Sequence, residues 1–294
     1  MKKENTAVFF AIFAAALYAV NVPFSKLLLL HVQPTMLAGF LYLGAGIGVG
    51  IMLGMRFAFV KERKEKWLTK KDMPFTIAMV VLDIVAPIFL MYGIKNTSSA
   101  NVSLLNNFEI VATSIIALVI FKEKITKRLW FAIFLVILAS IVLGFEVNGS
   151  IQFDVGSLFV LLACVCWGFE NNCTRRISEK SPEEIVVIKG VFSGIGSTTV
   201  AFLIGEHMPK LFYIGLVMLL GFVSYGLSIK FYITAQKSLG AAKTSAFYSI
   251  APFLGVGFSF LILKERPLLQ FYFALLVMII ATILMIIDSK DSDC

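Results

Sequence analysis

The chain of 294 residues is 59% hydrophobic and 15% charged, with a formal net charge of +8. Soluble proteins usually contain about 45–50% apolar and about 25% charged residues, so this composition excludes a single soluble domain, a disordered chain and a disulfide-rich secreted domain. Because there are only 2 His, and the 4 Cys lack metal-ligand spacing, we expect neither a metal site nor a cofactor.

Apolar windows long enough to cross a bilayer recur along the whole chain. A spanning helix needs about 20 mostly apolar residues. The first window is too long for a signal peptide, so we interpret it as a span. The sequence predicts an all-α integral membrane protein with ten transmembrane helices, near 7–30, 34–54, 74–94, 99–121, 129–145, 156–174, 184–205, 212–234, 243–263 and 268–287.

Basic residues are distributed unevenly between the predicted connections. With the N-terminus in the cytoplasm, 18 of the 26 Lys and Arg residues fall in cytoplasmic segments, 4 in external segments and 4 within spans. Cytoplasmic loops usually carry this excess. We therefore expect a multi-pass protein of the cell membrane with both termini in the cytoplasm. The positive charge indicates lipid headgroups as partners, and no nucleic acid.

Short motifs occur twice along the chain. The pattern at 100–103 and 121–124 recurs at 242–245 and 263–266, at an offset of 142 residues. In each copy a small or polar start leads into an apolar helix that closes on Lys-Glu-Lys or Lys-Glu-Arg. This repetition predicts that the protein consists of two similar halves.

The ten predicted helices divide into two repeats of five. We place the first repeat at 1–145, an external connection at 146–155, the second repeat at 156–287 and a cytoplasmic tail at 288–294. Five is an odd number, so the second repeat must enter the membrane with the opposite orientation. Two inverted five-helix repeats are an architecture typical of secondary transporters.

Ionisable residues occur at membrane depth in several windows. Asp83 and Glu109 are predicted at the middle of their helices, and Glu170 lies near the middle of its own. Each such group costs about 2.5–3.5 kcal/mol on insertion scales, so it usually faces a bundle interior or a wet cavity. Burial disfavours the charged form of a carboxyl group, which suits reversible protonation. Protons are therefore a candidate coupling ion.

Polar residues at helical spacing predict one central cavity. Two windows nearly free of polar residues, 129–145 and 268–287, are expected at the periphery. The residues predicted to bind substrate or a coupling ion are Glu109, Glu170, Asn106, Asp83, Tyr18, Asn21, Trp167, Asn171, Tyr248 and Tyr225.

A structural explanation competes for some of these positions. Ser and Thr often only hold helices together, and Asp83 could pair with a structural Lys. Lys26, Lys189 and Lys230 lie near span ends, where we expect them to extend to the headgroups.

Small residues and prolines predict local packing. Gly44-x-x-x-Gly48 and Gly190-x-x-x-Gly194 permit close helix approach. Pro87 and Pro252 lie inside predicted spans and should kink them.

The chain resembles paired EamA domains of the drug/metabolite transporter superfamily. The resemblance rests on residues 18–26 (Tyr to Lys) and 167–175 (Trp-Gly to Arg) in the first helix of each half, and on Phe-Lys-Glu-Lys at 121–124 and Leu-Lys-Glu-Arg at 263–266, which close the fourth. It implies ten helices, inverted halves and secondary transport of small metabolites, often export of amino acids or related compounds. The second half has the family's usual Pro, whereas the first has Glu109-Ile110 at that place.

The leading hypothesis is a secondary transporter with alternating access, and not an enzyme. No nucleotide-binding motif occurs, so a gradient or exchange must supply the energy. Two alternatives stay open: an integral membrane enzyme that acts on a lipid-linked substrate, and a channel or sensor without coupled transport. Substrate, direction of transport, coupling ion and oligomeric state do not follow from the sequence.

Overall fold

The computed structural model describes residues 2–59, 66–122, 125–147, 151–177, 179–239, 244 and 247–291. Parts of the repeated motifs (residues 123–124 and 242–243) and of the two predicted connecting and tail segments (residues 148–150 and 292–294) lie outside the described residues. The elements, in chain order, are α1 (Lys2–Ala19), α2 (Asn21–Leu28), α3 (Pro34–Phe59), η1 (Lys70–Asp72), α4 (Met73–Asn96), α5 (Ser99–Leu105), α6 (Phe108–Phe121), α7 (Lys127–Leu143), β1 (Phe145–Val147), β2 (Ile151–Phe153), α8 (Val155–Arg176), α9 (Pro182–Leu203), α10 (Leu211–Gly221), η2 (Phe222–Leu227), α11 (Ser228–Leu239), α13 (Ala251–Leu263) and α14 (Leu269–Asp291).

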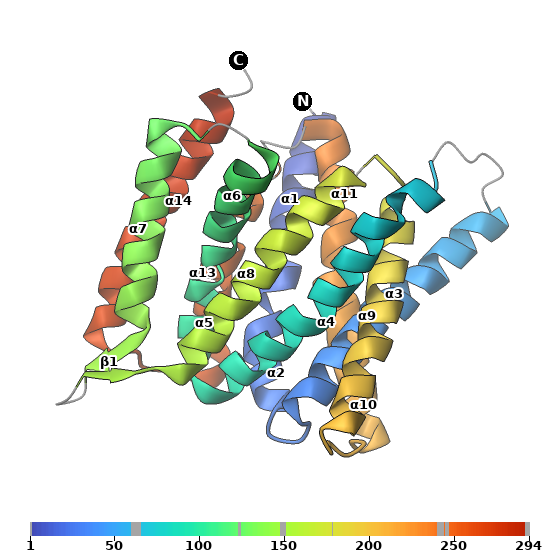
Figure 1. The fold of residues 1–294 in the computed structure, drawn as a ribbon, viewed down its shortest axis with the longest axis horizontal. Helices are drawn as coiled ribbons and strands as arrows, with labels where there is room; N and C mark the ends of the chain where they lie inside the picture. Colours follow the sequence, from blue (N-terminus) through green and yellow to red (C-terminus); the bar gives the residue numbers. More distant parts are fainter. Residues whose placement is uncertain are drawn as a thin grey trace.

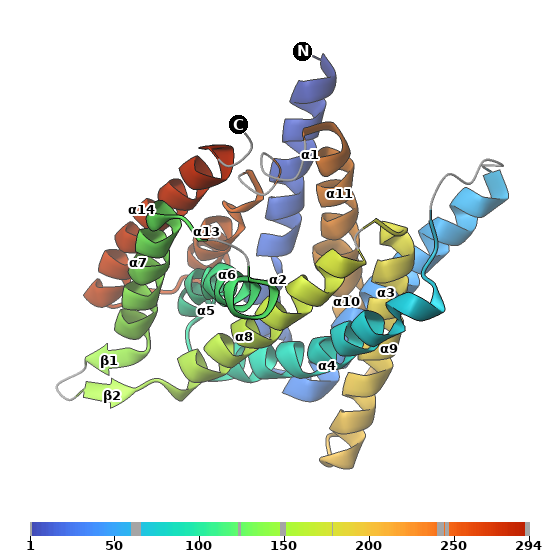
Figure 2. The same ribbon diagram turned by 45° about the horizontal axis from the view of Figure 1, so that its top comes forward.

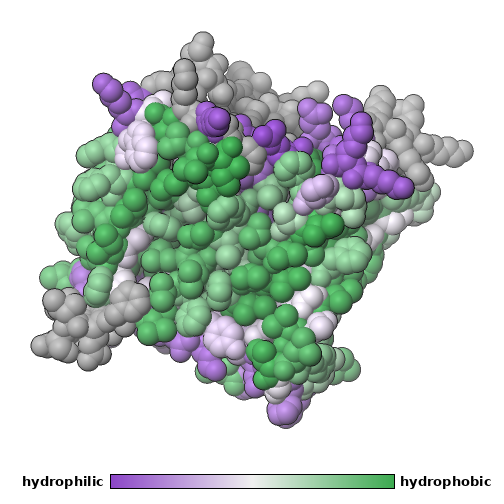
Figure 3. Space-filling model, viewed as in Figure 1, coloured by the Kyte–Doolittle hydropathy of each residue, from purple (hydrophilic) through white to green (hydrophobic). Residues whose placement is uncertain are grey.

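The described chain is a helical bundle apart from one short antiparallel hairpin, β1–β2. Eight helical segments are long and apolar enough to span a bilayer, and α13 is a shorter apolar helix. Figure 3 shows a broad hydrophobic band over the middle of the bundle, with hydrophilic side chains gathered at its upper and lower edges. The protein is therefore a multi-pass membrane protein.

Three windows predicted as single helices are interrupted in the structure. The first divides at Val20 into α1 and α2, the fourth at Asn106 and Asn107 into α5 and α6, and the ninth at residues 249–250, before α13. Pro23, in the first turn of α2, lacks the N–H that would bond the carbonyl of Ala19, the last residue of α1, and Pro252 stands in the first turn of α13. Pro87 lies within the uninterrupted α4. Proline therefore accompanies the first and ninth interruptions but not the fourth.

A π-helical segment, η2, joins α10 to α11. It spans Phe222–Leu227 and carries Tyr225, which is buried. Single π turns inside α-helices are rare and frequently accompany functional sites. The predicted span at 212–234 did not reveal this feature, because its pattern is simply apolar.

Glycines allow α3 and α9 to cross with their backbones in contact. A Cβ atom on Gly190 would lie 2.4 Å from the Gly46 Cα, and one on Gly46 would lie 2.5 Å from the Val191 backbone nitrogen. A Cβ on Gly194 would meet the Leu43 backbone nitrogen at 2.7 Å. The predicted packing role is thus confirmed for Gly190 and Gly194, whose partner on α3 includes Gly46, whereas Gly44 and Gly48 approach Met218 of α10 and Phe222 of η2. The α3–α9 crossing is a tight junction between the first and second parts of the chain.

Helices α7 and α14 pack against each other along one edge of the bundle (Figures 1 and 2). Thr126, which caps α7, donates its hydroxyl to Asp288 near the end of α14. Both chain termini lie at the same end of the bundle (Figure 1). The remaining helices surround the polar centre described next, as expected from the apolar composition of 129–145 and 268–287.

Candidate functional site

A lysine and two carboxylates form a buried salt-bridge cluster between α4, α8 and α9. The Lys189 Nζ lies 3.0 Å from the Asp83 Oδ2 and 3.0 Å from the Glu170 Oε1. The side chains of Asp83 and Glu170 are 0% and 2% exposed, and that of Lys189 is 17% exposed. Thr174 donates its hydroxyl to the same Glu170 oxygen. We call Asp83, Glu170 and Lys189 the acidic cluster.

The position of Lys189 corrects the sequence analysis. We expected this residue to extend to the headgroups, because it lies near the start of its predicted span. Instead its ammonium group forms ion pairs with two carboxylates that α4 and α8 hold in the bundle interior. Asp83 therefore has the structural Lys partner that was considered as an alternative.

Glu109 lies beside the acidic cluster at the start of α6. Asn171 of α8 donates its amide N–H to the Glu109 Oε1 at 2.7 Å and also contacts the Thr113 hydroxyl at 3.2 Å. Electrostatic interactions link Glu109 to both Glu170 and Lys189. The three predicted carboxylates thus converge on one region, in which Glu109 has an amide as partner and, among the described residues, no cation in a salt bridge with it.

Four tyrosines form the other side of the polar centre. The ring centroid of Tyr225 lies 5.9 Å from that of Tyr18 and 5.2 Å from that of Tyr42, and Tyr18 lies 6.0 Å from Tyr248. Asn21 of α2 donates to the Tyr225 hydroxyl at 3.1 Å. We call Tyr18, Tyr42, Tyr225 and Tyr248 the tyrosine cluster. The structure therefore brings together the predicted residues of α1, α2, η2 and the segment before α13.

Tyr42 connects the two clusters. Its hydroxyl donates to the Asp83 Oδ1 at 2.9 Å, and its ring packs against Tyr225. The sequence analysis missed this residue, because Tyr42 is isolated among the apolar and small residues of α3 and belongs to no polar stripe. Trp167 is buried in the same hydrophobic core as Tyr42 and Tyr225.

Three polar atoms near the interruption of α5 and α6 have no hydrogen-bond partner in the described part of the chain. They are the Asn106 Oδ1, the Asn107 Oδ1 and the Ser103 Oγ, in residues that are 7%, 2% and 1% exposed. Ser103 faces Gly255 of α13. Buried polar groups are usually satisfied, so these acceptors are suited to a ligand that donates hydrogen bonds.

Other predicted polar residues hold helices together. The Ser99 and Ser259 hydroxyls are 2.9 Å apart and link α5 to α13. Glu265 accepts the backbone N–H groups of Ser99 and Ala100 at 2.8 Å each. Lys26 was expected to extend to the headgroups. Its ammonium group instead donates to the backbone oxygen of Thr97 at 2.6 Å and to that of Ile94. These contacts link helices at the end of the bundle opposite to the termini.

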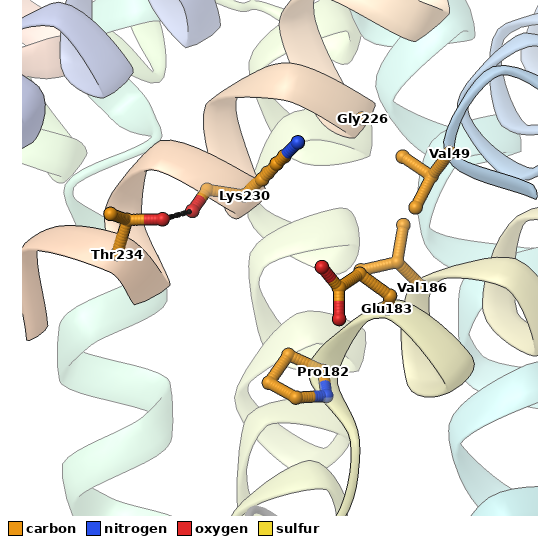
Figure 4. A pocket seen from close by; sticks show the side chains of 7 residues that line it. All are labelled: Val49, Pro182, Glu183, Val186, Gly226, Lys230 and Thr234. Carbon is orange, nitrogen blue, oxygen red and sulfur yellow. Dashed lines mark hydrogen bonds between the residues drawn. The ribbon is translucent and has the colours of Figure 1, made fainter. Parts of the chain in front are cut away.

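A small open pocket lies at the end of the bundle that carries the termini (Figure 4). Two of the residues that line the pocket are close in sequence to the clusters. Val186 lies one turn before Lys189 on α9, and Gly226 directly follows Tyr225. Lys230 points into this space in Figure 4. No residue of the acidic cluster or the tyrosine cluster lines this pocket; its lining is Val49, Pro182, Glu183, Val186, Gly226, Lys230 and Thr234.

The chain matches a known protein family over almost its whole length. The model of the EamA-like transporter family matches residues 5–145 and 154–287. The chain belongs to this family. An uncharacterized transporter of Methanothermobacter thermautotrophicus is 22% identical over 272 residues, covering 86% of this chain and 78% of that protein. The uncharacterized transporter YyaM of Bacillus subtilis is 22% identical over 243 residues, covering 80% and 79%.

A solved crystal structure shares the fold of this EamA-like chain. It superposes with a TM-score of 0.68, covers 99% of both chains and is 13% identical in sequence. The family assignment expected from the repeated motifs is confirmed, and it makes this protein a transporter embedded in a membrane. Among the described residues no group of three or more His, Cys, Asp and Glu could hold a metal ion.

Proposed function

We propose that the protein is a secondary carrier that moves a small amine or amino acid across the cell membrane by alternating access. The observation that carries this proposal is the junction of Asp83 and Glu109 from the first half with Glu170 and Lys189 from the second. Buried ionisable residues that face a bundle interior typically mark a transport pathway. Carboxylates beside tyrosine rings also suit an ammonium group.

Backbone geometry supports ten spans in two inverted repeats. Lys122 and Lys264 are the only non-glycine residues with positive φ in the described chain, at 56° and 53°. Both follow the last residue of a helix, α6 and α13, and they are 142 residues apart, the offset of the repeated motifs. The same strained turn at matching places indicates that the two halves share one fold, and five helices per half would invert the second.

The charge distribution supports an orientation with both termini in the cytoplasm. The termini share one end of the bundle with the open pocket, whereas Glu265 and Lys26 link helices at the opposite end. In this orientation the pocket faces the cytoplasm. Export or exchange of a cytoplasmic metabolite fits such a state, and protons are the candidate coupling ion because the carboxylates outnumber the lysine.

Reconstitution into liposomes tests the proposal. A thermal-shift screen of amino acids, amines and nucleosides first selects solutes that stabilise the protein by mass action. We expect these solutes to show saturable counterflow, in which unlabelled internal solute drives uptake of label. Loss of a charge-assisted hydrogen bond is worth about 1.5–3 kcal/mol, so Glu109→Gln and Glu170→Gln should each lower the rate about tenfold or more.

Glu179→Gln is the matched control, because that side chain is 84% exposed. It should transport like the wild type. Wild-type rates in both Glu109→Gln and Glu170→Gln would overturn the proposed site, and the absence of counterflow with every stabilising solute would overturn the proposed transport.

A further inference from the structure

The buried centre has more negative than positive charge. Asp83, Glu170 and Glu109 carry three carboxylates, and Lys189 supplies one ammonium group within their electrostatic reach. Burial of a charge without a partner is costly, so a closed and dry site has to be close to neutral. Lys189 therefore lowers the free-energy cost of burying these carboxylates when no substrate is bound.

The contacts of Lys189 are those that a free primary ammonium would make. Its Nζ lies at the same distance, 3.0 Å, from one oxygen of Asp83 and one of Glu170. An ammonium group has three donors and no acceptor, and the lysine stem is flexible. Lys189 is also the most exposed member of the acidic cluster, and Val186 of the open pocket lies one turn before it. The tethered cation can thus leave a carboxylate without unfolding its helix.

The two carboxylates differ in how they are held. Asp83 also accepts the Tyr42 hydroxyl at 2.9 Å, from a different helix, and its side chain is 0% exposed. Glu170 accepts the hydroxyl of Thr174, which belongs to its own helix, and is followed by Asn171, the partner of Glu109. This difference favours Glu170 over Asp83 as the carboxylate that a second ammonium reaches, while Lys189 stays with Asp83.

Unused acceptors next to this place favour a ligand with N–H donors. The Asn106 Oδ1, one turn before Glu109, is buried and has no partner among the described residues. The hydroxyl of Ser103 on the same side of α5 is likewise without one. An ammonium group can donate to such acceptors, whereas a carboxylate ligand would add a further negative charge.

We propose that Lys189 is a tethered counter-ion of the carrier, and that the ammonium group of the substrate displaces it from Glu170. This inference rests on the proposed function and names the chemical class of the ligand, a primary or secondary ammonium. When no substrate is present, Lys189 offsets part of the negative charge, which lowers the cost of returning the empty carrier across the membrane. The carrier can therefore perform net transport as well as exchange.

Thermal unfolding with n-butylammonium as the probe tests this role without any knowledge of the natural substrate. The Lys189→Ala variant leaves an ammonium-sized space between two carboxylates. We expect n-butylammonium to stabilise this variant with an affinity about tenfold or more above that for the wild type, in which Lys189 competes. Tetramethylammonium, which has no N–H donor, and neutral n-butanol should give no comparable shift.

Additional variants keep the test decisive if Lys189→Ala does not fold. Asp83→Asn combined with Lys189→Ala keeps one carboxylate in the space and should show the same probe-dependent stabilisation. Adding Glu170→Gln to that pair should abolish it, whereas Lys210→Ala, an exposed lysine at the end opposite to the termini, should behave as the wild type. Equal affinities for n-butylammonium in the wild type and in both folded Lys189 variants would overturn the proposal.

Transport separates failure of this inference from failure of the proposed function. With a counterflow substrate in hand, Lys189→Ala should retain exchange and lose net efflux about tenfold or more, because the empty carrier can no longer return with part of its negative charge offset. Equal loss of exchange and efflux would show that Lys189 only holds the fold. Absence of counterflow in the wild type would contradict transport, whatever the probe shows.

Discussion

Two adjacent residues of α9 make contacts that depend on opposite physical requirements. Gly190 packs against the backbone of α3, where a Cβ would lie 2.4 Å from the Gly46 Cα. Lys189 points to the other side, where its charge lies 3.0 Å from two carboxylates. The first contact needs the absence of a side chain and does not respond to a ligand. The second needs a cation, which a ligand can replace. A carrier that moves needs both, a fixed junction and an exchangeable charge.

The largest expected effect comes from filling the glycine junction. Gly190→Leu forces side-chain atoms into the α3 backbone, which cannot shift as a flexible side chain would. Overpacking of this kind costs about 1–3 kcal/mol and occasionally more. We expect the purified variant to unfold at a clearly lower temperature, with no rescue by n-butylammonium.

Gly54→Ala is the matched control on α3, since a Cβ there meets nothing within 4 Å. Its unfolding temperature should equal or slightly exceed that of the wild type, because alanine favours the helix. Equal unfolding temperatures for Gly190→Leu and Gly54→Ala would contradict the tight α3–α9 junction.

A smaller effect is expected at the link between the acidic and tyrosine clusters. Tyr42→Phe removes the hydroxyl that donates to Asp83 and leaves the ring in place. The loss of a hydrogen bond to a charged group corresponds to about 1.5–3 kcal/mol. Because Asp83 then holds Lys189 as its main partner, Lys189 should leave Glu170 more readily, and substrate affinity measured by thermal shift should rise. An unchanged affinity would show that Tyr42 acts only in packing.

Periodicity and composition predicted most of the spans, because apolar windows in a bilayer leave little choice of structure. They also predicted that Glu109, Glu170 and Asp83 converge, since a buried carboxylate must face other polar groups. They did not predict the partner of Asp83. Lys189 has a long side chain near a span end, and the same stem can reach lipid headgroups or the interior, so only the packing of α4 and α8 decides between them.

The interruption of the fourth window was also beyond the sequence. Asn106 was predicted on the polar face of one continuous helix, together with Glu109. Close to this interruption α5 crosses α13, where Ser103 meets Gly255. A propensity argument made along one helix does not include such a crossing.

Sided labelling of a single cysteine tests the central claim most directly. In a variant without the four native cysteines, Asn171→Cys places a thiol beside Glu109 at the polar centre. We predict that a membrane-impermeant thiol reagent modifies this residue from either face of oriented vesicles, and that a saturating transported solute slows both reactions. Leu211→Cys, which replaces an exposed side chain near the end opposite to the termini, should react from one face only. Modification of Asn171→Cys from a single face, or from neither, would contradict alternating access to a central site.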